Sequence, residues 1–194
     1  MPGGYIICEL ADVKKEYPDF QRAMRELDEA IIAKCEADWR RSVGYLTPGA
    51  NEFGRTTILP ALFQDNTGTQ MVTWRQKFTS TGHQRILAGV RSGYTIPEDF
   101  KVAWIGLAFP NATQQLTEIK FQIGDRKYGR INLEELEYYE VPALIFEKGF
   151  IIDEEQSFEL YGYIKEADYQ RIVMLGACYY KVLDKVLGNP GSAI

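Results

Sequence analysis

With 194 residues, the chain is long enough for one main domain with a sizeable core. Its net charge of −5 argues against a general nucleic-acid-binding protein, because such proteins draw their affinity from clustered Lys and Arg that neutralise phosphates. No apolar stretch approaches the roughly 20 residues that cross a bilayer, and the first 20 residues lack the charged and apolar regions of a secretion signal. We therefore expect a soluble protein without direct nucleic-acid binding and without a transmembrane segment.

The chain before residue 48 predicts one amphipathic helix. Apolar side chains recur at steps of three and four residues from Phe20 to Trp39, and the opposite face is dense in charge. A helix with one apolar stripe needs an apolar partner, which is either the sheet of the same chain or another copy of the chain. We predict that the stripe lies at a subunit interface, with five candidate residues: Phe20, Met24, Leu27, Ile31 and Trp39.

Residues 45–66 predict a long connection, since Pro, Gly, Asn and Asp are mixed there with short apolar pieces. Such a connection gives the helix the reach to dock on a neighbouring subunit, as exchanged arms do in symmetric assemblies. The expected organisation is therefore an N-terminal helix and extended arm in residues 1–66, a β-sandwich domain in residues 67–188, and a flexible tail in residues 189–194.

From Met71 onward the sequence changes to short runs rich in Val, Ile, Tyr, Phe and Thr, separated by turn residues. The clearest hairpin alternates apolar and polar residues and turns at Gly124-Asp125. A polar bend at residues 153–156 separates two further runs. The predicted strands and the hairpin lie in residues 71–79, 84–90, 101–109, 116–133, 141–152 and 157–164.

Residues 169–183 fit either a strand or a helix. The strand is favoured because β-branched and aromatic residues cluster around Gly176. The sum is about eight short strands with turns between them, after one helix. The sequence therefore predicts a mainly β protein, an antiparallel β-sandwich, and the jelly roll is the most economical eight-stranded form of it.

Four runs in the C-terminal half carry a resemblance: KVAWIGLAFPN, EIKFQIGDRKYGRINLEEL, FEKGFIIDEEQSFELYGYI and QRIVMLGACYY. In this order they resemble the strand succession of the jelly-roll structural proteins of viruses and phages. The resemblance implies a non-enzymatic capsid or capsid-associated protein that is located in the virion and has copies of itself and other virion proteins as partners. Without the resemblance, the cytoplasm is the expected location.

Residues that would carry catalysis or bind a metal are sparse. His83 is the sole histidine and lies among turn formers, so it cannot build a multi-histidine metal centre, and no GxSxG elbow accompanies it. Cys8, Cys35 and Cys178 are odd in number and lie among apolar residues, which predicts reduced thiols in the core. We therefore predict no catalytic residue, no metal site and no cofactor.

Paired carboxylates leave a glycoside-processing enzyme as a third hypothesis, since that chemistry needs two acids roughly 5–10 Å apart across a cleft. The segments DNTGT and DEEQ could also offer oxygens to calcium, although neither has EF-hand spacing. Acids at strand ends and bends are ordinarily solvating residues, and that interpretation is favoured. The carboxylates in question are Glu134, Glu135, Glu137, Glu140, Glu147, Asp153, Glu154 and Glu155.

Aromatic side chains support an alternative function, a carbohydrate- or ligand-binding β-sandwich, because exposed rings can stack on sugars. The candidates are Trp74, Trp104, Tyr128, Tyr138, Tyr139, Tyr161 and Tyr163. A position in the core or at an interface is the favoured interpretation for each ring. The leading hypothesis is thus a structural protein that forms homo-oligomers.

Overall fold

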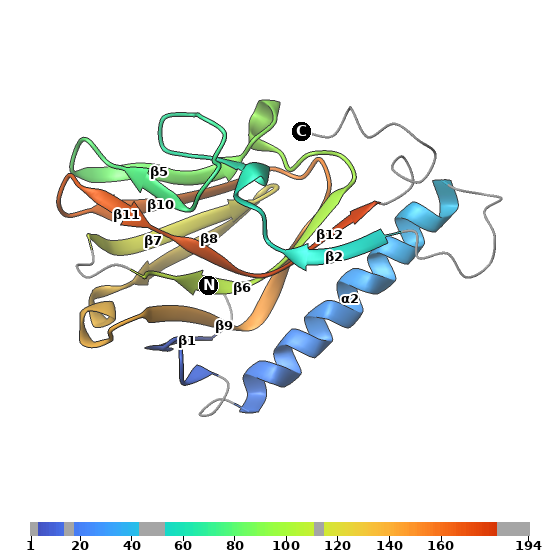
Figure 1. The fold of residues 1–194 in the computed structure, drawn as a ribbon, viewed down its shortest axis with the longest axis horizontal. Coiled ribbons are helices and arrows are strands. Elements are labelled where there is room, and N and C mark those ends of the chain that lie inside the picture. Colours follow the sequence, from blue (N-terminus) through green and yellow to red (C-terminus); the bar gives the residue numbers. More distant parts are fainter. Residues whose placement is uncertain (1–3, 14–17, 43–52, 111–114, 182–194) are drawn as a thin grey trace.

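The computed structural model describes residues 4–13, 18–42, 53–110 and 115–181 (Figure 1). The described chain is mainly β, with one long helix near its N-terminus. No helix in these ranges is both long and apolar enough to span a membrane. The elements are β1 (Tyr5–Glu9), α2 (Pro18–Ser42), β2 (Phe53–Thr57), η1 (Pro60–Leu62), β3 (Phe63–Gln64), β4 (Arg75–Lys77), β5 (Gly82–Gly89), η2 (Ser92–Tyr94), β6 (Phe100–Ala108), β7 (Leu116–Ile123), β8 (Arg126–Asn132), η3 (Glu134–Tyr138), β9 (Pro142–Ile152), β10 (Phe158–Ile164), β11 (Tyr169–Arg171) and β12 (Val173–Lys181).

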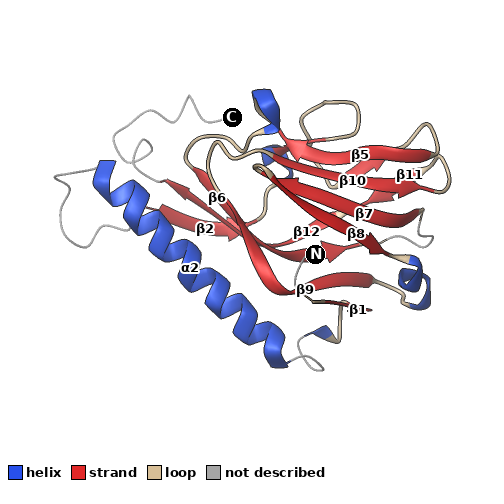
Figure 2. Cartoon of the chain, turned by 180° about the vertical axis from the view of Figure 1, so that it is seen from behind, coloured by secondary structure: helices blue, strands red, loops and turns tan. Residues whose placement is uncertain are grey.

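Two five-stranded antiparallel sheets pack face to face (Figure 2). Sheet A has the strand order β1-β9-β6-β12-β2, and sheet B has the order β3-β5-β10-β7-β8. Strands β4 and β11 form a separate two-stranded ribbon. The protein is therefore an antiparallel β-sandwich, as the sequence predicts.

The strand order is that of a jelly roll. Eight strands form the jelly roll and are numbered one to eight along the chain: β2, β5, β6, β7, β8, β9, β10 and β12. Their order is one-eight-three-six in sheet A and two-seven-four-five in sheet B. Successive strands thus cross from sheet to sheet except at the β7–β8 hairpin, where Gly124 turns the chain with a φ of 56°. This is the connectivity of the eight-stranded jelly roll with its two Greek keys.

The core between the sheets is aromatic. Strand β7 alternates buried and half-buried residues, which directs Ile119, Phe121 and Ile123 inward. The ring of Trp104, fully buried in β6, lies 4.8 Å from that of Phe121 and 4.9 Å from that of Phe146, both in edge-to-face geometry. Such contacts add stabilisation beyond the area they bury.

Helix α2 lies on the outer face of sheet A, in contact with β9, β6 and β12. Its predicted apolar stripe faces the sheet, where Leu27, Ile31 and Trp39 are buried. The sheet presents small side chains in this layer, among them Ala103, Ala143 and Ala177. The predicted N-terminal helix is confirmed, and its partner in the structure is the sheet of the same chain.

The predicted connection over residues 45–66 is wrong in its second part, because β2, η1 and β3 occupy residues 53–64. Strand β2 reads FGRTT, which has no apolar alternation, because it is an edge strand with half-exposed residues. Its hydrogen-bonding partner is β12, with Thr57 opposite Ala177. The sandwich also includes β1, so it begins well before the predicted boundary at residue 67.

The C-terminal part agrees better with the sequence prediction. Residues 169–171 and 173–181 form β11 and β12, so the strand interpretation is confirmed through Lys181. The run predicted at residues 71–79 forms a strand only in β4. The tail predicted at residues 189–194 lies outside the described residues.

A substitution at Gly149 tests the seating of the helix. A Cβ atom there would lie 2.3 Å from Leu27 Cδ2 and 2.9 Å from the carbonyl oxygen of Trp104. We expect Gly149→Ala to lower the free energy of unfolding by about 1–3 kcal/mol, because overpacking forces the helix or β9 to shift. Urea denaturation measures this change. Gly129→Ala is the control, since its Cβ would meet nothing within 4 Å; equal effects of both substitutions would contradict the proposed close approach.

Candidate functional site

The structure separates the predicted carboxylates. Glu134, Glu135 and Glu137 lie exposed on η3, and Glu140 is exposed just beyond it. Asp153 and Glu154 come together in one group of carboxylates, beside Asp38 of α2, which the sequence analysis did not single out.

A buried lysine is the centre of this charged cluster. Lys101, at the start of β6, is fully buried, and its ammonium group donates hydrogen bonds to one carboxylate oxygen each of Asp38, Asp153 and Glu154. The distances are 2.9 Å to Asp38 and 3.2 Å to Glu154. We call these four residues the Lys101 cluster. The indole N–H of Trp39 also donates to Glu154, at 3.1 Å.

Neighbouring groups also bind the carboxylates of the cluster. Lys34 forms an ion pair with Asp153, and the backbone N–H of Asp99 donates to Glu154 at 3.1 Å. The three carboxylates lie close enough to hold a metal ion, since one oxygen of each lies within 4.8 Å of the others. The ammonium group of Lys101 already makes a hydrogen bond to each of them, so a metal ion would have to displace it.

The pKa values of Lys101 and Asp153 are shifted in the directions that favour the charged form of each group. Burial by itself lowers the pKa of Lys101, but the hydrogen bonds to its three carboxylates outweigh burial and raise it above 10.5. Burial raises the pKa of Asp153, whereas Lys101 and Lys34 lower it more, so that the pKa lies below its ordinary value. A general acid needs a raised carboxyl pKa, so Asp153 is unsuited to that part in glycoside hydrolysis. The cluster joins α2 to the sheet.

The other residues considered for catalysis or metal binding are the histidine and the three cysteines. His83 lies at the start of β5 rather than in the predicted turn, and its ring contacts Tyr163 with centroids 5.1 Å apart. The three cysteines are buried, as predicted. Burial raises the pKa of the Cys35 and Cys178 thiols to about 12, which makes both poor nucleophiles.

The predicted aromatic residues divide between core and surface. Trp104 is the centre of the core, Trp74 packs against it, and Tyr128 is half-buried on Phe121. Tyr138 and Tyr139 are exposed at the end of η3.

Tyr161 and Tyr163 lie on the outer face of sheet B. Tyr161 stands opposite Arg85 of β5 and Lys120 of β7, and Tyr163 stands opposite His83 and Glu118. The Tyr161 hydroxyl donates to Glu159 at 2.6 Å, and this bond, with burial, raises the Tyr161 pKa to about 12. The face is extended by Tyr94, whose ring centre lies 4.3 Å from the Arg85 guanidinium. We call this surface the open face; its residues are His83, Arg85, Tyr94, Glu118, Lys120, Glu159, Tyr161 and Tyr163.

The stripe predicted as a subunit interface is covered within the chain. Leu27, Ile31 and Trp39 are buried on sheet A, and Phe20 and Met24 are half-buried beside an apolar pocket of about 420 Å³. A contact between subunits through these residues stays a prediction, and it would require the helix to exchange with that of another copy.

Comparison of the chain with protein-family models, with curated proteins and with solved structures found no match.

Replacement of Lys101 tests the cluster. Lys101→Met removes the cation from three carboxylates, and we expect the free energy of unfolding to fall by about 3 kcal/mol, because an unpaired buried charge is costly. Lys34→Met is the control, since Lys34 is 40% exposed and such a pair contributes about 1 kcal/mol or less. Urea denaturation of both variants measures the difference. A Lys101→Met protein as stable as the wild type would contradict the assigned role.

The lowered pKa of Asp153 predicts a dependence of stability on pH. A carboxylate with a folded-state pKa below its unfolded value of 3.8 stabilises the protein fully above that value. The stabilisation is lost as the pH falls through the lowered pKa. We expect the stability difference between wild type and Asp153→Asn to shrink on acidification in this window, as measured by urea unfolding at a series of pH values. Glu137→Gln is the control, since Glu137 is exposed and pairs with Lys165, which is also exposed. A difference for Asp153→Asn that is independent of pH would exclude the linkage.

Proposed function

We propose that the protein is a non-enzymatic structural protein whose copies associate into a larger assembly, as a capsid or capsid-associated component of a virion. The jelly-roll strand order supports this, because jelly rolls build viral capsid and lectin domains. The observation that carries the proposal is that one outer face of the sandwich is covered and the other is exposed. Sheet A is closed by α2, whereas sheet B presents the open face to solvent (Figure 2).

The open face is rich in tyrosine and carries an arginine. Both residue types are enriched among the hot spots that carry most of the binding energy of an interface. Here Tyr94, Tyr161 and Tyr163 lie among charges of both signs. Glu118 and Glu159 of one copy can meet Arg85 and Lys120 of another, so that the face is suited to contacts between copies or with other virion proteins.

An enzyme is less well supported. The two predicted acids that the structure brings together, Asp153 and Glu154, share the ammonium group of Lys101 and belong to a network that joins α2 to the sheet. This geometry accounts for stability, and it lowers the pKa of Asp153, whereas a general acid needs a raised one.

Assembly tests the function, and one substitution tests the surface. The wild type should form larger species as concentration rises, visible by light scattering and as rings, sheets or shells by electron microscopy. We expect Tyr163→Asp to weaken association about 30-fold or more, the effect of losing an interface hot spot of about 2 kcal/mol.

Tyr138→Asp is the matched control, because Tyr138 is 84% exposed on η3 and outside the open face. A wild type that stays monomeric at every concentration would refute the proposed function. A Tyr163→Asp variant that assembles as the wild type does would refute the open face as the contact surface.

A further inference from the structure

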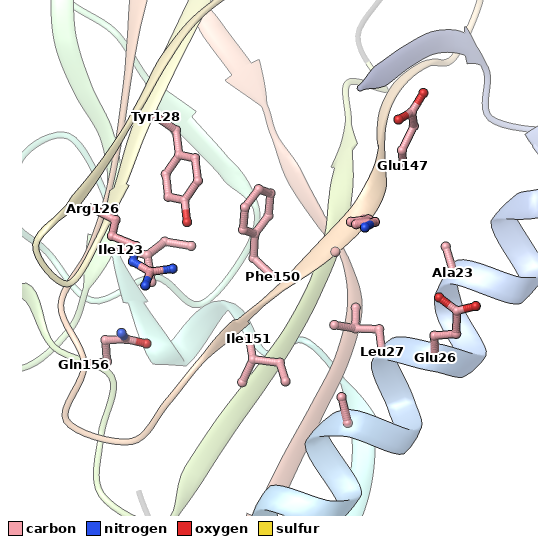
Figure 3. A pocket seen from close by; sticks show the side chains of 13 residues that line it. Ala23, Glu26, Leu27, Ile123, Arg126, Tyr128, Glu147, Phe150, Ile151 and Gln156 are labelled. Carbon is pink, nitrogen blue, oxygen red and sulfur yellow. The ribbon is translucent and has the colours of Figure 1, made fainter. Parts of the chain in front are cut away.

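A groove of about 640 Å³ lies between α2 and the β7–β8 hairpin (Figure 3). At the base of the groove the pairing of β6 with β9 is irregular. Trp104 is paired with Phe150 and Gly106 with Ile145, so an advance of two residues along β6 corresponds to five residues along β9. The additional residues form a bulge that carries Glu147 to the groove. Bulges are over-represented next to functional sites, and the volume lies within the roughly 300–1,000 Å³ of small-molecule pockets.

The floor of the groove is apolar and partly aromatic. Leu27 of α2 and Ile123 of β7 line it. The ring of Phe150 meets that of Tyr128 with centroids 4.9 Å apart, and Tyr128 is stacked on buried Phe121 at 4.6 Å. Phe150 and Tyr128 are both half-buried, so the core holds the two rings in place while part of each remains accessible.

Charged side chains of both signs surround this floor. Arg126 and Gln156 lie on the side of the hairpin, and Glu26 and Glu147 lie on the side of the helix (Figure 3). Lys148 supplies a second cation, so two carboxylates face two cations and the lining has no net charge. Within the described ranges, the side chains of Arg126, Glu147 and Lys148 form no hydrogen bond or ion pair, which leaves their polar atoms for a ligand.

We propose that this groove binds an uncharged oligosaccharide. A lining without net charge offers little attraction to an anion or a cation, whereas separate donors and acceptors match hydroxyl groups, which both donate and accept. The C–H surface of a sugar ring packs on apolar and aromatic groups such as those of the floor. The inference does not depend on assembly of the chain.

Titration of the ¹⁵N-labelled full chain, kept dilute, with a panel of uncharged gluco-, manno-, galacto-, xylo- and N-acetylglucosamine oligomers tests the proposal. We expect at least one oligomer to shift the amide signals of Arg126 and of residues 147–151 in a saturable way. Arg126→Ala should weaken this binding about tenfold, as the loss of a charged hydrogen-bond donor does. Lys127→Ala is the matched control, because Lys127 is the neighbouring exposed cation of β8 and does not line the groove.

Four outcomes would overturn the proposal. One is that no oligomer of the panel produces saturable shifts in the groove. Another is that Arg126→Ala and Lys127→Ala bind equally well. The third is that an acidic oligosaccharide binds more tightly than its uncharged counterpart, which would indicate an anion site. The fourth is that the groove signals shift with protein concentration alone, which would indicate that a segment of a second copy occupies the groove. Glu147→Gln provides a second variant, expected to weaken binding while it keeps the shape of the rim.

Discussion

Sheet A is apolar on both of its faces, and the rest of the structure depends on this constraint. Every residue of β6 from Lys101 to Ala108 is buried, which explains why the strand reads as an almost continuous apolar run. Its inner face meets sheet B around Trp104. Its outer face needs a second cover, and α2 supplies it with a stripe whose large side chains each contribute roughly 1.5–3 kcal/mol on burial.

The Lys101 cluster follows from the same constraint. A charged residue in a strand covered on both sides loses its hydration, so it is tolerated only where several partners replace the water. Asp38 comes from the helix, and Asp153 and Glu154 come from the bend after β9. The cluster therefore forms only when α2 lies correctly on the sheet, and it ties the position of the helix to that of the bend.

Because α2 covers only sheet A, the sandwich has two different surfaces for interaction. The open face uses the outward side chains of sheet B, where cross-strand rows place Tyr161 beside Lys120 and Tyr163 beside Glu118. The groove uses Ile123 of β7, which points to the other face of sheet B, together with Tyr128 of β8 and the near side of the helix. The alternation of strand residues thus lets one hairpin contribute to both surfaces. An assembling protein built in this way can keep its groove accessible while the open face is covered.

The sequence by itself determined the amphipathic helix, the hairpin at Gly124-Asp125, the strands on either side of the 153–156 bend and the class of antiparallel sandwich. In the helix and the strands, apolar residues recur with a period of 3.6 or 2 residues within a short stretch of sequence. Local patterns therefore suffice to reveal these features. The sequence did not predict strands β1 and β2. An edge strand such as β2, with the sequence FGRTT, is defined by its hydrogen bonds to β12 and not by its own apolar pattern. Only the tertiary structure decided that Lys101 would meet Asp38 and Asp153, that the stripe of α2 would find its partner within one chain, and that a bulge in β9 would open a groove beside Arg126. The reason is physical: these contacts join residues far apart in the sequence, and their energies depend on distances and on exclusion of water that exist only once the sheets have packed.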